Sequence, residues 1–197
     1  MKITKPALVL VGLLLLTAVS ACDKKPETAP VQKTEPASAE PKPAAEKAGP
    51  MLDGWKKFSS TQGSFSVLLP NDPKESDQQF GKLAMHGFAA QKNPQSGFGV
   101  SYCDFPKTAD AKKVYDEVQT ITVGKEAKLV SQKDLTFENY PAREFEFNRG
   151  GKANYTAHTL MIMVGQRLYT LAVISLTADQ HPDERDAFFN SFSVSKN

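Results

Sequence analysis

The sequence has few of the residues that build catalytic and metal centres. Its 197 residues include two cysteines, three histidines and one tryptophan. The histidines, at positions 86, 158 and 181, do not pair at a metal-ligand spacing on one predicted element, so we expect no metal site. There is no G-x-S-x-G elbow that would place a nucleophile at a strand end. We therefore expect neither enzymatic activity nor a cofactor.

An excess of charge of either sign is also missing. The chain has 24 basic and 22 acidic residues. Two of the basic residues, Lys2 and Lys5, lie in an N-terminal segment that we expect to be removed, which leaves 22 of each sign. Binding to nucleic acid requires a basic patch or stripe, and binding to anionic lipid through side chains requires a polybasic run. The balance predicts no nucleic-acid partner.

No apolar run is long enough to cross a membrane. The uncharged stretch from residue 7 to residue 21 is shorter than the roughly 20 apolar residues that a membrane-spanning helix needs. It follows two lysines and ends in the small residues of Val19-Ser20-Ala21. A basic start, a short apolar core and small residues at the end are the layout of a secretory signal peptide. We expect residues 1–21 to be such a peptide.

Cys22, directly after these small residues, makes the segment resemble the lipobox of bacterial lipoproteins. The resemblance implies that the Cys22 thiol carries a diacylglyceryl group and begins the mature protein, and two acyl chains hold a protein stably on a bilayer. In similar Gram-negative lipoproteins an aspartate at the position of Asp23 favours the periplasmic face of the inner membrane. Lys24 departs from the strongest form of that signal, so sorting to the outer membrane remains the alternative.

Residues 22–50 begin with the lipidated cysteine and continue as a spacer that is rich in Pro, Ala, Lys and Glu. The segment after Cys22 has no aromatic residue and one bulky aliphatic residue, Val31. Such a composition cannot bury enough apolar surface to offset the entropy of ordering, so we expect it to be disordered. As a coil it would reach about 30 Å, and as polyproline II about 85 Å.

Residues 51–197 are long enough for one domain with its own core. Apolar residues alternate along seven predicted strands, whereas Ala111, Val114, Val118 and Ile121 recur at helical spacing. Thr108 or Asp110 can cap that helix. The predicted strands are 63–70, 83–90, 98–104, 129–137, 142–147, 154–164 and 167–176, the helices are 108–122 and 182–191, and 193–195 is a possible edge strand.

The hairpin of 154–164 and 167–176 has apolar residues on both faces if Val164 pairs with Arg167. A hairpin of this kind belongs at the centre of a sheet that is covered on both sides. The sequence therefore predicts an α+β fold in which helices lie on the faces of an antiparallel β-sheet.

The order of motifs resembles the PsbP-like superfamily. The segments are FSVLLPNDPK, SYCDFPK before a helix, YPAREFEF, VGQRLYTLAV and a closing DAFFNSF. The order of anchor, linker and domain is most similar to that of envelope lipoproteins of the DcrB-like type. The resemblance covers about residues 52–195 and implies a PsbP-like sandwich that acts as a binding or assembly module. It supplies no catalytic residues to carry over.

Three places deserve a structural test. Cys103 alternates with core positions on its strand, which predicts a buried, unpaired and inert thiol. His158 shares a face with Leu160 and Ile162, which predicts a hydrogen-bonded core histidine. Arg149, Gly150 and Gly151 form a possible binding loop because the arginine offers a fork of donors, although the same residues also suit a plain hairpin turn.

These observations predict a membrane-anchored periplasmic lipoprotein that acts as a non-catalytic binding or assembly module, with a protein partner in the cell envelope. The alternative is a hydrolase-like envelope enzyme with an unrecognised pocket. A structural lipoprotein that supports a larger complex is a third possibility. An enzyme should show titratable residues that converge in a pocket.

Overall fold

The structure is a computed structural model that describes residues 52–80, 83–151 and 154–195. The predicted signal peptide, the predicted linker, Cys22 and Asp23 lie outside these ranges. Within them, neither helix has the length and apolar character needed to cross a bilayer.

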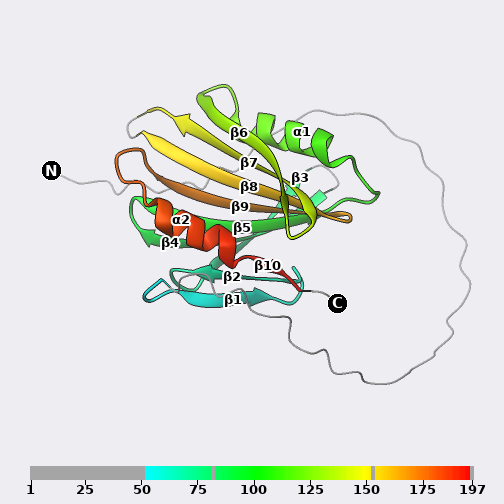
Figure 1. Cartoon of the computed structure of the whole chain (residues 1–197), viewed down its shortest axis with the longest axis horizontal. Coiled ribbons are helices and arrows are strands. Elements are labelled where there is room, and N and C mark those ends of the chain that lie inside the picture. The colour runs from blue at the N-terminus through cyan, green and yellow to red at the C-terminus, as the bar shows by residue number, and fades with distance from the viewer. Residues whose placement is uncertain (1–51, 81–82, 152–153, 196–197) are drawn as a thin grey trace, which may run out of the picture.

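The described chain forms two antiparallel sheets and two helices (Figure 1). The large sheet has seven strands in the order β3-β4-β5-β9-β8-β7-β6, and the small sheet has three in the order β1-β2-β10. The elements are β1 (Lys56–Ser60), β2 (Phe65–Leu69), β3 (Lys74–Phe80), β4 (Leu83–Asn93), β5 (Ser96–Asp104), α1 (Ala111–Val123), β6 (Ala127–Phe137), β7 (Tyr140–Arg149), β8 (Tyr155–Val164), β9 (Arg167–Leu176), α2 (Pro182–Ser191) and β10 (Ser193–Val194).

The hairpin of β8 and β9 lies at the centre of the large sheet, as its two apolar faces predict. Val164 pairs with Arg167 across the turn, and Gly165 takes the positive φ of 61° that this two-residue turn requires. Along β8 the residues from 156 to 163 are buried without interruption. A strand buried on both faces cannot show the usual alternation of apolar and polar residues.

One face of the large sheet is covered by the small sheet with α2 beside it. Phe65 at the start of β2 is fully buried, and its ring packs against Tyr102, Tyr169 and Phe192 at centroid distances of 5.7–6.4 Å. From α2, Phe188 meets Phe98 edge to face at 5.4 Å. These contacts join β2, β5, β9 and the end of α2 into one aromatic core.

The other face of the large sheet packs against α1. Val114 and Tyr115 from the helix lie on Phe145, Met161 and other buried residues of β7, β8 and β9. Asp110 caps the helix, since its Oδ1 accepts a hydrogen bond of 2.8 Å from the backbone N–H of Lys113. The chain leaves the helix through Gly124 at a φ of 64°. Of the two predicted caps, Asp110 is the one used.

The expectation that helices cover the sheet is met in part. The described fold is mostly antiparallel β-sheet with two helices, and much of the cover on one face comes from β1 and β2 rather than from a helix. Neither β1 nor β3 was predicted. Both predicted helices are present, as are the seven predicted strands, and 193–195 contributes β10 to the small sheet.

The outer strands of the large sheet differ in length, with 7 residues in β3 and 11 in β6. β6 lies at one edge and has one neighbour, β7. Leu129 and Val130 on β6 are the large apolar side chains exposed among the described residues, at 40% and 49%. The register with β7 shifts between Leu129 and Ser131, so Val130 forms a β-bulge.

Candidate functional site

Three groups of charged residues on the large sheet are candidates for a site. The first surrounds Arg143 on β7, which is only 1% exposed. Its Nε donates to Asp134 Oδ1 and its Nη1 to Asp116 Oδ1, both at 2.5 Å, and its guanidinium lies over the ring of Tyr115. The hydrogen bond from Arg143 lowers the pKa of Asp134. This group is internally paired and joins α1 to β6 and β7.

The second group surrounds Tyr102 on β5. Its ring is stacked on His86 at 5.0 Å, with the guanidinium of Arg167 4.6 Å from its centroid. Arg167 donates two hydrogen bonds to Asp104, at 2.6 and 2.7 Å, and these bonds lower the pKa of that carboxyl. The Tyr102 hydroxyl is buried and has no hydrogen-bond partner among the described residues. Burial raises its pKa.

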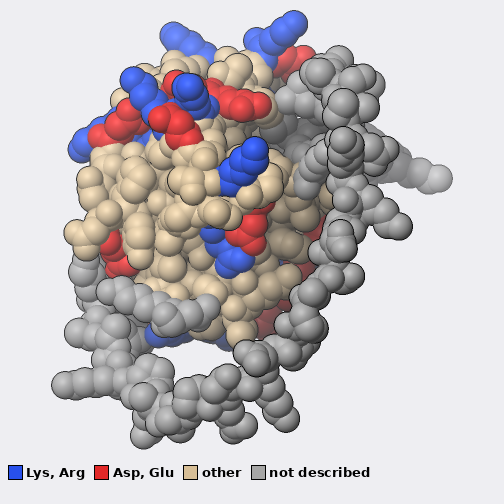
Figure 2. All heavy atoms as spheres, turned by 90° about the vertical axis from the view of Figure 1, so that its right-hand side faces the viewer, with Lys and Arg blue, Asp and Glu red and all other residues tan. Residues whose placement is uncertain are grey.

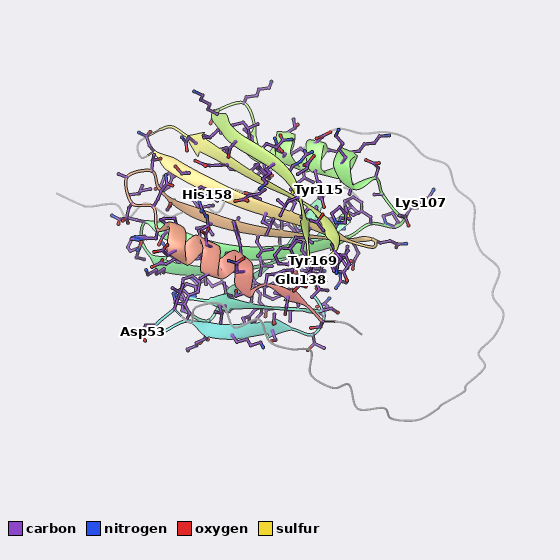
Figure 3. All side chains as sticks on the ribbon, viewed as in Figure 1. Asp53, Lys107, Tyr115, Glu138, His158 and Tyr169 are labelled. Atoms are coloured by element: carbon purple, nitrogen blue, oxygen red, sulfur yellow. The ribbon has the colours of Figure 1, made fainter. Side chains whose placement is uncertain are left out.

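The histidines lie apart in the fold. His86 Nδ1 is 2.7 Å from Asp77 Oδ1, and exposed His181 is the N-cap of α2. His158 on β8 is 7% exposed, with Gln180 and Arg185 each 3.4 Å from a ring nitrogen, which agrees with a hydrogen-bonded core histidine (Figure 3). Within the described ranges, no three His, Cys, Asp or Glu side chains are grouped as a metal site would need.

Cys103 is a free thiol, but the prediction of full burial is wrong. The side chain is half-buried at the border of the core beneath α1. It stands one residue before the end of β5, and α1 begins only at Ala111, so the cover over this end of the strand is incomplete. Burial raises the Cys103 pKa to about 11. Such a pKa keeps the thiol protonated and unreactive at neutral pH.

The third group forms a pocket of about 410 Å³ around Arg149, the last residue of β7. The pocket is lined by the connection between α1 and β6, the start of β6, the end of β7, the residue before β8 and the residue after β9. Its lining residues are Lys125, Glu126, Ala127, Lys128, Asn148, Arg149, Gly150, Asn154 and Thr177.

The Arg149 guanidinium is poorly satisfied within the chain. Its Nη2 donates a long hydrogen bond of 3.5 Å to the carbonyl of Val123 near the end of α1. Its Nε is buried and has no partner among the described residues. A buried donor without an acceptor costs about 1–3 kcal/mol. The pocket therefore holds an arginine whose hydrogen-bonding capacity is largely unused.

The predicted binding loop contributes to this pocket in part. Arg149 and Gly150 line it, whereas Gly151, with a φ of 149°, lies beyond the wall. Sequence reasoning missed Lys125 and Lys128, which come from the segment after α1 and are far from Arg149 in the sequence. The sequence shows two lysines shortly after Gly124, where the helix ends. Their position near Arg149 depends on the register of β6 and β7, in which Ala127 lies opposite Arg149.

The end of the molecule formed by the β8–β9 turn and the start of α1 offers no comparable site. Figure 2 shows this end, where basic and acidic side chains gather together toward the top of the view above a largely uncharged area. The exposed surface of α1 has Lys112 and Lys113 close to Asp116 and Glu117. Charges of both signs so close together do not form the basic patch that a polyanion requires.

Comparison with known proteins gives information about the fold. No protein family matches the sequence, and no curated protein is detectably similar to it. Among solved structures, the cyanobacterial PsbP protein CyanoP from Synechocystis is similar at 16% identity with a TM-score of 0.53, covering 75% of this chain and 96% of CyanoP.

Two further solved structures are more distant. A protein from Bacteroides thetaiotaomicron has a TM-score of 0.47 at 16% identity, covering 73% of this chain and 50% of its own. A Pseudomonas aeruginosa protein of unknown function, described as a putative regulator, has a TM-score of 0.44 at 12% identity, covering 70% of this chain and 92% of its own. The similarity to CyanoP, together with the sheet order described above, shows that this chain has a PsbP-like fold.

Proposed function

We propose that this protein is a non-catalytic binding or assembly module of the bacterial cell envelope, tethered to a membrane by a lipid on Cys22. Asp23 favours the periplasmic face of the inner membrane, with the outer membrane as the alternative. The observation that carries the binding role is the Arg149 pocket, in which a buried guanidinium nitrogen has no partner among the described residues. A partner protein of the envelope would bond the accessible part of the half-buried Arg149 side chain, which lines the pocket.

The tether supports the same role. The linker that the sequence predicts would let the domain search tens of ångströms around its anchor. The search volume is small, so the effective concentration of the domain near other envelope proteins is high. A binding module gains from this arrangement, whereas an enzyme that acts on a diffusible substrate gains little.

The test is complementation of a deletion strain, scored by its phenotype under envelope stress. We expect Cys22→Ala and Arg149→Gln to lose function, and alanine substitutions at His86, Cys103, His158 and His181 to retain it. Immunoblots of membrane and soluble fractions show which variants accumulate stably and in which fraction they reside. Full function of soluble Cys22→Ala would overturn the proposed tether.

One observation favours the alternative of an envelope enzyme. Asp77 and His86 form a close pair, and His86 is stacked on Tyr102, whose buried hydroxyl lacks a partner among the described residues. An aspartate that orients a histidine is the arrangement of a general base. In the same complementation panel, loss of function in a stable, correctly located His86→Ala protein would favour the enzyme and overturn the binding module.

A further inference from the structure

We infer that the Arg149 pocket binds an oxyanion, either a carboxylate or a phosphate group. This inference rests on the proposed function, because it specifies the chemical group through which the module would hold its partner.

The four arginines of the sequence provide an internal comparison, and all four lie in the described ranges. Arg143 is bonded to Asp134 and Asp116, Arg167 to Asp104, and Arg185 to its neighbour Asp186. Arg149 has no ion pair with any described residue, and its one hydrogen bond goes to a backbone carbonyl at 3.5 Å.

Arg143 and Arg149 lie on the same face of β7, six residues apart, so the acceptors that the fold supplies to each can be compared directly. Arg143 is the more buried of the two and is supplied with two carboxylates from α1 and β6. Arg149 occupies the end of the strand, where no carboxylate is supplied. Its neighbour on β6 is Ala127, and the end of α1 offers only a backbone carbonyl. The fold provides the acceptors for one arginine and leaves the other facing a pocket.

The pocket wall is positively charged. Lys125, Lys128 and Arg149 are opposed by one acidic residue, Glu126. Both lysines are exposed, so their side chains are free to reorient toward a bound group. An arginine fork matches the two oxygens of a carboxylate or phosphate, and lysines beside it add attraction from flexible point charges.

A neutral residue of the pocket wall, Asn148, adds to this preference. The side-chain carbonyl of Asn148 already accepts a hydrogen bond of 2.8 Å from the hydroxyl of Thr156. The amide group that Asn148 can offer to a ligand is therefore its NH₂ donor. Thr177 lies 3.1 Å from the same Thr156 hydroxyl, whose one proton already goes to Asn148, so Thr177 donates its own proton to Thr156 and has none left for a ligand. The free NH₂ donor of Asn148 favours an acceptor-rich group over a cation.

The experiment follows the Nε–Hε resonances of the four arginines in the ¹⁵N-labelled full chain in detergent micelles. Sodium phosphate and sodium acetate are titrated separately, at an ionic strength held constant with sodium chloride. We expect the Arg149 resonance to shift and saturate while that of Arg143 stays in place. Saturation by phosphate identifies a phosphate site, and saturation by acetate a carboxylate site. Failure to saturate with either anion overturns the inference.

Two pairs of variants test where the anion binds. Arg149→Gln should weaken binding at least tenfold, measured by calorimetry, whereas Lys107→Gln at the far end of the sheet should not change it (Figure 3). Because Arg149 also contacts the end of α1, a second variant keeps the test independent of folding. Glu126→Gln should tighten binding two- to fivefold, and Glu75→Gln on distant β3 should leave it unchanged.

An unchanged affinity in Glu126→Gln would place the anion elsewhere and overturn the inference. These measurements use purified protein and inorganic or acetate ions, and the complementation panel reads localisation and phenotype in cells. The absence of anion binding together with loss of function in Cys22→Ala would therefore reject the oxyanion site and leave the tethered module in place.

Discussion

At the scale of single residues, Arg143 shows how the fold holds a charge beneath α1. Its guanidinium is buried, yet it bonds two carboxylates that are themselves more than half exposed. Water therefore solvates the acidic partners while the protein supplies the acceptors for the arginine. A buried charge is tolerated when it is paired in this way. Removing one partner of such a pair lowers the stability of the fold.

We expect Arg143→Ala to lower the free energy of unfolding by about 3 kcal/mol. The substitution removes the hydrogen bonds to Asp116 and Asp134 and the contact with the ring of Tyr115, and leaves a cavity beneath α1. Urea denaturation measures the change, with Lys107→Ala on the exposed surface as the control. A loss equal to that of the control would mean that the network contributes nothing to stability.

Cys103 links stability to alkaline pH. Its pKa is raised by burial from the ordinary thiol value of 9.0 to about 11 in the folded protein. Between these values the unfolded state binds fewer protons, so the free energy of unfolding falls as pH rises from about 9 to 11. Below pH 9 the stabilisation that comes from the raised pKa of Cys103 is fully present.

We expect Cys103→Ser to reduce this fall. The measurement is urea denaturation of the wild-type chain and of the variant at pH 8, 9, 10 and 11. Tyrosines and lysines also titrate in this range, and the difference between the two proteins isolates the thiol. Parallel stability curves for the two proteins would show that burial does not affect this cysteine.

At the scale of elements, α1 illustrates what local sequence can determine. Its apolar spacing and its end at Gly124 are readable from the sequence and are confirmed, whereas the sequence left the cap open between Thr108 and Asp110, and the structure uses Asp110. The missed strands show the limit. β1 has one large apolar residue, Phe58, and β3 is the polar segment KESDQQF at a sheet edge. Neither shows the alternation that identifies a half-buried strand.

The cap of α1 can be tested with a matched pair of variants. Asp110→Ala removes the hydrogen bond to the Lys113 N–H and should lower the free energy of unfolding by about 1 kcal/mol. Thr108→Ala, at the other position that the sequence suggested, should have no measurable effect because Thr108 is exposed and lies outside the helix. Thermal denaturation of both proteins makes the comparison, and equal melting temperatures would contradict the assigned cap.

At the scale of the whole molecule, both hydrophobic cores are built from residues between Trp55 and Val194. The small sheet brings the two ends of this region together, since β10 pairs with β2. The central hairpin and the antiparallel class were predictable, because apolar residues on both faces leave few alternatives. The Arg149 pocket was predictable only as a loop, because its lysines reach it through sheet register.

Residues 51–197 should therefore fold as an independent unit. We expect a chain that starts at Met51 to unfold in one cooperative transition, with the same midpoint in urea as the mature protein. Circular dichroism and tryptophan fluorescence of Trp55 should give coincident curves, because Trp55 packs on Phe98 in the main core. A lower midpoint in the shorter chain would show that the linker packs on the domain.

The bulge at Val130 has a consequence for how copies of this protein behave when crowded together. An edge strand with unpaired backbone groups is a template on which a second chain can add and aggregate. On β6 the bulge breaks the regular spacing of those groups, and Lys128 and Lys133 on either side would face like charges in a second copy. The exposed Leu129 and Val130 thus sit on a strand that is unsuited to edge-to-edge polymerisation.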